Sequence, residues 1–401
     1  MSQNNTNSPY TRLGYGETSD FASSAIKSMG GAAIANRSES AINYLNPASF
    51  SSIDSMTFKL DFGGFGKISR FTDNNGLGRS SNGNFEYVCM HFPLFKNIAF
   101  SAGMLPYSVL GYKLTTKDTL VDNFKLPNDS SIESKYPYSA YYSGKGGINQ
   151  VYTGFSAKLF NHLSIGVNAY YMFGSINHAS ELYFKSQDLY NSNHIQQITN
   201  QNFRFRYGVQ YFTTFASKHS ICIGAIYENK ASMNATVYNS YKSDVKGDTL
   251  ISKNGFELPQ TFGMGLTYSL DNKLTFSTDY TLLQWSNAQF FGKTDSLRNQ
   301  SKIGFGTEFI PNFKSRYYFN RIRYRVGISI TDPYYTINGN IPPKNYSITL
   351  GFGFPFRNTK SMVNTCFEYG KIGSVNLLQE DYFKFSISIV TNEFWFFKRK
   401  L

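Results

Sequence analysis

Short connections alternate with long polar segments along this chain, and that alternation constrains the fold more than any other feature. Six connections are short: Leu94–Asn97, Phe160–His162, Ser217–His219, Leu270–Lys273, Pro311–Tyr317 and Arg357–Lys360. Seven segments between them are long: Arg70–Gly83, Tyr107–Gly144, Ser186–Gln201, Tyr241–Asn254, Ala288–Asn299, Asp332–Pro343 and Lys371–Gln379. Outer-membrane β-barrels connect their strands in this way, with short periplasmic turns and longer outside loops. The pattern predicts an all-β, antiparallel transmembrane barrel of about fourteen strands.

Apolar and polar residues alternate with a period of two in the segments that would form the barrel wall, which indicates strands with two different faces. One segment places Arg204 and Arg206 opposite a face made of Phe203, Phe205, Tyr207, Val209 and Tyr211. Another places Arg321, Arg323 and Arg325 opposite a face made of Ile322, Tyr324, Val326, Ile328 and Ile330. Each run has about the 9–11 residues that a tilted strand needs to cross a bilayer. We therefore expect the five arginines to form a basic face in the lumen.

Composition agrees with a barrel. Charged residues make up 16% and aromatic residues 17% of the chain, whereas a soluble protein carries about 25% charged residues. No stretch approaches the ~20 apolar residues of a membrane-spanning helix. A soluble sandwich or propeller is the alternative fold. It explains the alternation of residues but not the alternation of connection lengths.

Several classes of function are disfavoured. The net charge is +13, but the basic residues are spread along the predicted strands and turns, so we expect no nucleic-acid partner. The three cysteines form no paired motif, and the five histidines lack metal-ligand spacing. No constellation of catalytic residues was found. We therefore expect no enzyme, no cofactor and no metal site.

The first 56 residues differ from the rest. They are rich in Ser, Ala, Asn and Gly, and they contain turn-forming sequences at Gly30-Gly31 and Asn46-Pro47-Ala48. A solvated tail is one interpretation. The other is a plug, residues 1–56, folded into the lumen of a barrel formed by residues 57–401, since a barrel this wide would otherwise leave an open pore.

Five motifs give the chain a resemblance to the long-chain fatty-acid transporter (FadL-like) family of outer membranes, in its Bacteroidota-type branch. Met29–Ala33 together with Asn46–Phe50 resembles the family's plug. Gly103-Met104-Leu105-Pro106-Tyr107 is similar to the end of its third strand. The remaining motifs are Leu258-Pro259 with Gly263 and Gly265, Asp279-Tyr280 with Trp285-Ser286, and the opening Ser8–Gly14.

The resemblance implies a fourteen-stranded barrel with a plug, located in the outer membrane and conducting hydrophobic molecules. No apolar signal core follows Met1, so an exported chain is expected to be numbered from its mature form or from another start. Pro106 cannot donate to a β-ladder and Gly103 lacks a side chain, so we expect a kink or lateral gap in the third strand. The arginine face departs from the family pattern, because an oily conduit should not be strongly cationic.

Two functions remain open, and both place the chain against outer-membrane lipid and lipopolysaccharide. The first is a transport channel for hydrophobic small molecules. The second is a non-transporting barrel that serves as a subunit of a larger envelope assembly for secretion, outer-membrane protein insertion or surface anchoring. The arginines are likewise open to two interpretations. They bind an anionic ligand, or they pair with barrel carboxylates and with Glu17, Asp20 and Glu39 of the N-terminal segment.

Overall fold

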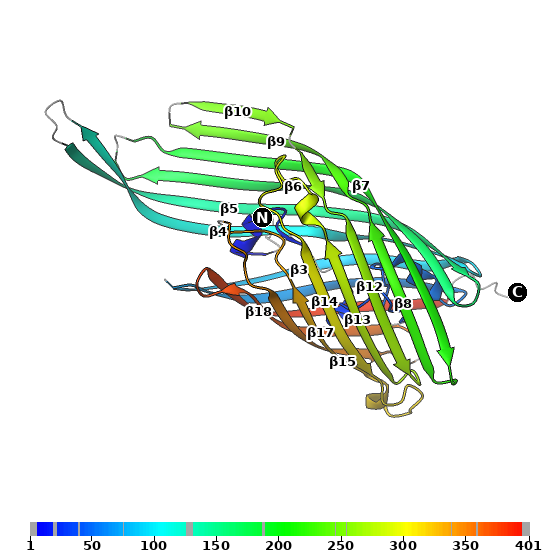
Figure 1. Cartoon of the computed structure of the whole chain (residues 1–401). Coiled ribbons are helices and arrows are strands. Elements are labelled where there is room, and N and C mark those ends of the chain that lie inside the picture. Colours follow the sequence, from blue (N-terminus) through cyan, green and yellow to red (C-terminus); the bar gives the residue numbers. More distant parts are fainter. Residues whose placement is uncertain are drawn as a thin grey trace, which may run out of the picture.

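One antiparallel sheet forms most of the molecule, and fourteen of its eighteen strands close into a barrel (Figure 1). The computed structural model describes residues 6–18, 22–38, 41–74, 76–125, 131–186, 189–244, 246–253, 255–337, 339–357 and 360–394. The barrel strands are β2 (Thr57–Thr72), β3 (Leu77–Phe95), β4 (Ile98–Lys125), β5 (Ser131–Leu159), β6 (Leu163–Phe184), β7 (Ser192–Phe215), β8 (His219–Glu228), β12 (Thr261–Leu270), β13 (Leu274–Leu283), β14 (Gln300–Phe309), β15 (Arg323–Thr331), β16 (Asn345–Pro355), β17 (Met362–Ser374) and β18 (Leu378–Phe394). The barrel closes where β18 pairs with β2. The predicted fold class is confirmed.

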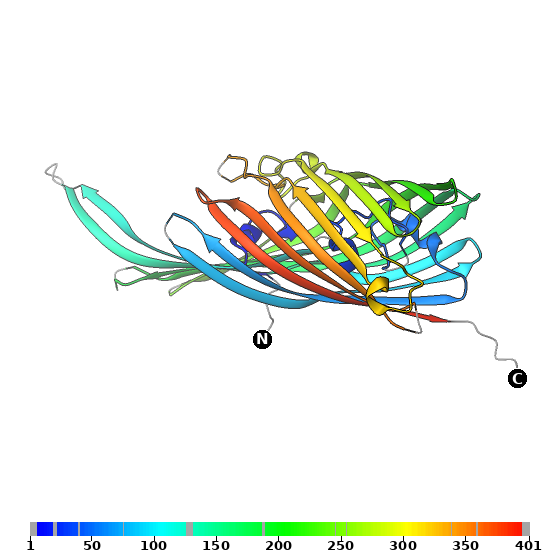
Figure 2. The same ribbon diagram turned by 90° about the horizontal axis from the view of Figure 1, so that it is seen from below.

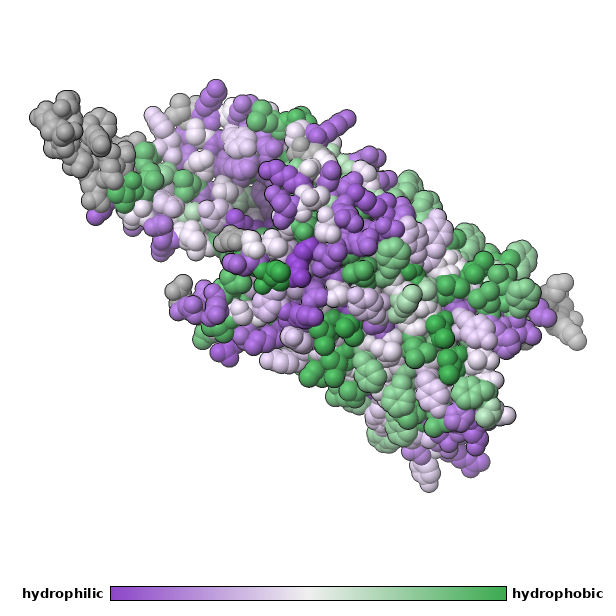
Figure 3. Space-filling view, viewed as in Figure 1, coloured by the Kyte–Doolittle hydropathy of each residue, from purple (hydrophilic) through white to green (hydrophobic). Residues whose placement is uncertain are grey.

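The alternation of residues along each strand becomes an alternation of exposure. On β7, Phe203 and Phe205 are 60% and 42% exposed on the outer surface, whereas Arg204 and Arg206 between them are buried. Hydrophobic side chains gather over the barrel wall in Figure 3, and hydrophilic side chains gather where the long segments emerge. A wall of this kind suits lipid outside and protein inside. No helix among the described residues is long and apolar enough to cross a membrane.

Several segments that the sequence assigned to long loops are strands. β4 and β5 contain 28 and 29 residues and stay paired from Ile98 to Lys125, so they cover most of the predicted loop Tyr107–Gly144. Three further strands are β9 (Ala231–Ser243), β10 (Gly247–Ser252) and β11 (Phe256–Leu258). β9 follows β8 and pairs with the outer part of β7, and β10 and β11 pair with the other side of β9. The outer parts of β4–β7 together with β9 and β10 form a single-layered extension, which we call the projecting sheet (Figures 1 and 2).

The N-terminal segment (residues 6–18, 22–38 and 41–53) lies within the barrel (Figure 2). Its elements are η1 (Pro9–Arg12), β1 (Glu17–Thr18), α1 (Ser24–Lys27) and η2 (Pro47–Ser52). Two further short helices, η3 (Trp285–Asn287) and η4 (Tyr318–Arg321), lie in connections between strands. We call the end of the barrel that bears the projecting sheet the upper end and the end that bears the short turns the lower end. η2 contacts the wall near the lower end, whereas η1 contacts β4 near the upper end. The segment therefore runs along the lumen from the end that bears the projecting sheet to the end that bears the short turns.

Candidate functional site

Eight glycines on the lumen side of the wall form a band against the N-terminal segment, which we call the glycine ring: Gly166, Gly208, Gly224, Gly265, Gly304, Gly306, Gly327 and Gly351. Several are direct cross-strand partners, such as Gly166 with Gly208 and Gly224 with Gly265. A Cβ added at Gly224 would lie 2.3 Å from the carbonyl oxygen of Ile34, and one added at Gly306 would lie 2.3 Å from that of Met29. The backbone of the N-terminal segment thus lies directly on the backbone of the wall, where no other residue type fits.

Asp279 of β13 provides the carboxylate in this band. Its cross-strand neighbours are Gly265 on β12 and Gly304 on β14, so the side chain has open space on both sides. The Oδ2 atom accepts hydrogen bonds from the backbone N–H groups of Ala33 and Ile34, the second at 2.7 Å. A buried carboxylate must have such donors, and two adjacent N–H groups of a turn provide them. Asp279 therefore anchors the N-terminal segment to the wall.

Gly30 and Gly31 end α1 and turn the chain along the glycine ring. Both have positive φ angles, 65° and 77°, which favour glycine. The Gly31 N–H donates to the Ile26 carbonyl at 3.1 Å, which closes the helix in the manner of a glycine C-cap. A Cβ on Gly30 would lie 2.4 Å from the Ile328 carbonyl oxygen. The turn therefore favours glycine at both positions, and contact with the wall requires it at Gly30.

Asn46, Pro47 and Ala48 make a second turn at the lower end of the lumen. The Asn46 side chain accepts from the Ala48 N–H at 3.1 Å and caps η2, and Pro47 occupies the first position, where no donor is needed. The same side chain donates to the Ile34 carbonyl at 2.7 Å. Ser164 of β6 donates to the Ala48 carbonyl at 2.6 Å. The turn thus connects two parts of the N-terminal segment and binds the wall.

Four of the five predicted lumen arginines are paired with barrel carboxylates. Arg204 and Arg206 both bind Glu228 of β8, with 2.9 Å from Arg204 Nη2 to Glu228 Oε2. Arg206 also donates to the Leu45 carbonyl of the N-terminal segment at 3.1 Å. All three charged side chains are buried. Two cations around one carboxylate leave a positive charge, and backbone carbonyls of the N-terminal segment partly compensate it.

Arg323 and Arg325 repeat the arrangement on the other side of the barrel. They donate to the two oxygens of Glu308 on β14, at 2.8 and 2.7 Å. Arg325 further donates to Asn364 at 2.9 Å. Arg321 is the exception, since it lies in η4 with its guanidinium 5.4 Å from the Tyr318 ring. The alternation in the sequence includes Arg321, but the strand begins only at Arg323, so Arg321 is not part of the predicted strand face.

Charges also pair between the N-terminal segment and the wall. Lys27 of α1 is in direct contact with Glu86 of β3, and both side chains are buried. Burial lowers the pKa of Lys27, and the Glu86 carboxylate opposes that effect. Glu17 lies 3.7 Å from Lys67, and no salt bridge joins it to an arginine in the part of the chain that the structure describes. Asp20 and Glu39, the other carboxylates expected to meet the arginines, lie outside the described residues.

Gly103 and Pro106 lie on β4, the third strand of the barrel, where the ladder to β3 ends. The last pair is Val88 with Met104, and β3 and β4 continue separately above it. A bulge between Pro106 and Ser108 interrupts the ladder to β5 on the other side. A Cβ on Gly103 would lie 2.6 Å from the Val88 carbonyl oxygen and 2.7 Å from Cys89 Sγ, so the last pairs of this ladder leave no room for a side chain at Gly103. The two residues mark the boundary between a paired and an unpaired part of the wall.

The N-terminal segment occupies the edge that β4 presents above this boundary. β1 pairs there, with Glu17 opposite Val109 and Thr18 opposite Ser108. The Thr11 hydroxyl donates to the Gly111 carbonyl at 3.0 Å. The separation between β3 and β4 is therefore covered from the lumen side by protein.

Aromatic residues close the upper end of the lumen. Tyr15 packs against Trp285 with ring centroids 5.4 Å apart, and Trp285 stacks on Tyr334 at 4.7 Å. The Tyr15 N–H donates to the Tyr334 hydroxyl at 3.0 Å. All three side chains are buried. The N-terminal segment is thus fixed to the connections that follow β13 and β15.

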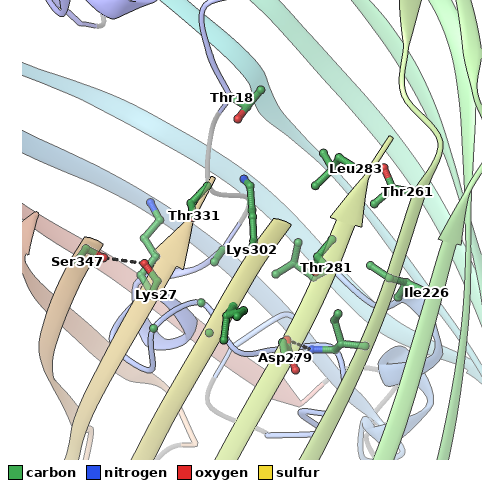
Figure 4. Close-up of a pocket in the computed structure, with 18 of the residues that line it drawn as sticks. Thr18, Lys27, Ile226, Thr261, Asp279, Thr281, Leu283, Lys302, Thr331 and Ser347 are labelled. Carbon is green, nitrogen blue, oxygen red and sulfur yellow. Dashed lines mark hydrogen bonds between the residues drawn. The ribbon is translucent and has the colours of Figure 1, made fainter. Parts of the chain in front are cut away.

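A cavity of about 150 Å³ remains between the N-terminal segment and the wall formed by β7, β8 and β12–β16. Figure 4 shows Lys27, Asp279 and Lys302 around it, together with Ile226 and Leu283. Charged, hydroxyl and apolar side chains alternate in its lining. The cavity has room for a few water molecules or one small molecule.

The sequence reasoning missed the glycine ring and Asp279 as one unit. The signal was present, because Gly208, Gly327 and Gly351 all fall on the polar face of alternating segments. A glycine on the lumen face of consecutive strands indicates close approach by another backbone. What could not be read from the chain is that these positions lie at one level of the barrel, since that depends on the register between strands.

Comparison with solved structures shows a shared fold. The toluene transporter TodX of P. putida is 15% identical, with 94% of this chain and 99% of that chain covered and a TM-score of 0.59. The toluene transporter TbuX of Ralstonia pickettii is 14% identical, with 92% and 98% covered and a TM-score of 0.59. A Pseudomonas aeruginosa FadL homologue is 12% identical, with 96% and 100% covered and a TM-score of 0.63. At these identities the likeness concerns the fold alone.

Comparison of sequences gives a different family name from the one the motifs resembled. No curated protein sequence matches the chain. A family model described as BamG matches residues 1–401, which is the whole chain. The FadL-like resemblance therefore holds for the architecture.

Proposed function

The chain belongs to the BamG family, and we propose that it is a non-transporting barrel subunit of a larger outer-membrane assembly. Among the assemblies considered, the family name favours the one that inserts barrel proteins into the outer membrane. In this proposal the N-terminal segment, residues 1–56, is a permanent plug, and the barrel of residues 57–401 anchors the subunit in lipid.

The glycine ring carries the proposal. It brings the N-terminal segment against seven strands, β6–β8, β12 and β14–β16, by its backbone at five of them and by the side chains of Asn46, Pro47 and Ser28 at β7 and β16, and Asp279 of β13 completes the contact. The cavity of about 150 Å³ lies beside these contacts, so a molecule too large for it could cross the lumen only by displacing the segment from the wall. A segment that is hydrogen-bonded across the lumen is what a structural subunit needs and what a conduit must release.

The arginines support the same proposal. Glu228 and Glu308 engage four of them, and Leu45 and Asn364 take further donors. Breaking such buried pairs costs about 3–5 kcal/mol each. They therefore stabilise the interior rather than present a free anion site.

Purification from native membranes tests the proposal. The tagged chain, extracted from outer membranes in mild detergent, should co-purify with other outer-membrane proteins in fixed ratio, and the purified barrel should be non-conducting in planar bilayers. Deleting residues 6–53 should raise the conductance, because the wall would remain and the lumen would empty. Isolation of the wild-type chain alone, from cells in which its deletion abolishes uptake of a hydrophobic tracer, would show a transporter instead.

A transport channel is the second candidate, since TodX and TbuX are described as toluene transporters and since the β3–β4 ladder ends near Pro106. In this alternative the wall between β3 and β4 is a lateral exit. Pro106→Thr, which restores a backbone donor, should then reduce tracer uptake. Pro137→Thr on β5 is the matched control, because Pro137 is an exposed strand proline in the projecting sheet. Equal uptake in both variants and the wild type would favour the subunit.

A further inference from the structure

We propose that the free edge of β10 in the projecting sheet docks an extended segment of a partner polypeptide, which adds to the sheet as a further strand. The inference rests on the proposed role as an assembly subunit and names the surface through which a partner is held. β10 pairs with β9 along six residues, from Gly247 to Ser252. Among the described residues, no strand pairs with its other side.

Backbone geometry shows which groups of β10 point outward. The β9–β10 hairpin is closed by the Ser243 N–H, which donates to the Lys246 carbonyl at 2.7 Å. Hydrogen-bonded and non-hydrogen-bonded pairs alternate along an antiparallel ladder. Counting from that bond, Thr249 and Ile251 direct their N–H and C=O groups away from β9. The Thr249 N–H donates to the Asp248 side chain at 2.7 Å, so a docked strand would exchange this local bond for one to its own carbonyl.

The same edge is already used for pairing further down the chain. The Glu257 N–H donates to the Gln289 carbonyl at 2.9 Å, and the Gly292 N–H donates to the Gly255 carbonyl at 2.8 Å. A loop of this protein thus extends the sheet beside β11, and β11 and β10 share one register against β9. The loop stops at Gly255, so the outward groups of β10 are the next positions on a ladder that has already begun.

The two edges of the projecting sheet differ in their protection. An exposed edge is usually guarded by lysine, proline or a bulge. The β4 edge carries Lys113 and Lys117, whereas β10 has no lysine or proline between Gly247 and Ser252. Instead Leu250 and Ile251, on opposite faces, are 55% and 65% exposed. Asp248 is the one charged residue of β10. An edge with two exposed apolar side chains and no lysine, proline or bulge is suited to pairing with another chain in water.

Exposed side chains indicate the sequence of the partner. Lys242 and Lys246 at the hairpin end of β10 are accompanied by the exposed Asp244 and Asp248, whereas Lys253 at the other end has no acidic neighbour in sequence. Among the described residues, no carboxylate forms a salt bridge with any of these lysines. The geometry fits a strand of about six residues with apolar side chains at two adjacent positions, one beside Leu250 and one beside Ile251, and with Asp or Glu at the end near Lys253. Peptide recognition at sheet edges combines main-chain bonds with side-chain contacts in this way.

Photo-cross-linking in intact cells tests the inference. A benzophenone amino acid placed at Thr249 or at Ile251 of the full-length protein should give an adduct with one partner polypeptide. Mass spectrometry should place the two attachment points on the same extended segment, about two residues apart. Adducts scattered over several proteins, adducts only with lipopolysaccharide, or adducts only with a second copy of this chain would each overturn the proposal.

Variants separate the edge from the proposed function. Thr249→Pro removes an N–H group that points away from β9, and the hydrogen bonds between β9 and β10 are kept. The double change Leu250→Lys with Ile251→Lys places two charged side chains on β10, which disfavours pairing with another strand. Each should reduce the adduct and the recovery of that partner at least tenfold. The matched control, Leu120→Lys with Val121→Lys, makes the same change at the β4 edge, where both residues are 45% exposed, and should retain the partner.

The outcomes distinguish the two claims. If the wild type co-purifies with partners and the β10 variants do so equally, the edge is not the docking site, whereas the subunit role stands. If the wild type co-purifies with nothing, the subunit role itself is wrong. Heat-modifiable mobility on gels shows whether every variant has a folded barrel.

Discussion

Replacing Asp279 by Ala should release the middle of the N-terminal segment from the wall while the barrel stays folded. The substitution removes the acceptor of two buried N–H groups, those of Ala33 and Ile34. A buried donor left without a partner costs about 1–3 kcal/mol, so the two together cost about 2–6 kcal/mol. The β13 ladders to β12 and β14 use backbone groups only, and they are unaffected.

Hydrogen exchange measures this cost directly. Since about 1.4 kcal/mol corresponds to tenfold, the amides of Ala33 and Ile34 in the folded full-length barrel should exchange roughly 30-fold to 20,000-fold faster in Asp279→Ala. Asp279→Asn keeps one acceptor oxygen and loses only the charge assistance, so its effect should be about 1 kcal/mol. Conductance in planar bilayers should rise in the same order.

Ser277→Ala is the matched control. Ser277 is buried on the same face of β13, and its hydroxyl bonds Thr267 at 2.9 Å within the wall. It should leave exchange at Ala33 and Ile34 unchanged. If the Ala33 and Ile34 amides exchange at the same rate in Asp279→Ala as in Ser277→Ala, Asp279 is not the anchor of the segment.

Two further substitutions test the packing and the charges of the lumen. Gly306→Ala places a Cβ 2.3 Å from the Met29 carbonyl oxygen. It should destabilise the state in which the N-terminal segment packs on the wall by about 1–3 kcal/mol, and this should be seen as faster proteolysis of the segment. Gly66→Ala is the control, because its Cβ would meet nothing within 4 Å, and it should leave the rate of proteolysis unchanged. Glu228→Gln leaves Arg204 and Arg206 without their carboxylate and should lower the stability of the folded barrel by about 3–5 kcal/mol in urea titrations followed by gel mobility. Asp271→Asn, which removes an exposed pair with Lys273, should leave the midpoint unchanged, and a similar shift in both variants would contradict the assignment.

The strand count and the faces of the strands were predictable because they depend on local alternation. The lipid-facing run from Phe203 to Tyr211 and the buried Arg204 and Arg206 between its members were identified in this way. The carboxylate partner was not, because Glu228 lies on the next strand and its position opposite Arg206 depends on register. The sequence indicated which residues face inward but not which of them meet.

Strands that leave the membrane were mistaken for loops for a physical reason. The outer parts of β4 and β5 have solvent on both faces, so they need no apolar face, and Lys113 to Thr119 reads as a polar loop. Their strand conformation is set by long-range pairing and not by local pattern. Arg321 shows the reverse error, in which a residue outside the strand was assigned to it. The alternation in the sequence includes Arg321, but Arg321 ends the short helix η4 and the strand begins at Arg323.

The glycine ring also limits how the lumen can open. Glycine in a strand costs about 0.5–1 kcal/mol relative to alanine, so eight lumen-facing glycines weaken the wall unless something packs on them. The N-terminal segment supplies that packing, with Met29, Gly30 and Ile34 in contact with glycines on four different strands. These glycines lie on one half of the wall, whereas Glu86 of β3 binds Lys27 from the other half, so a shift of the segment away from the glycines presses it towards β3. Opening therefore requires the segment to leave the ring as a whole, which the Asp279 and Gly306 variants should make easier. A partner bound at β10 meets neither the ring nor the segment, and it can be held by a barrel that never opens.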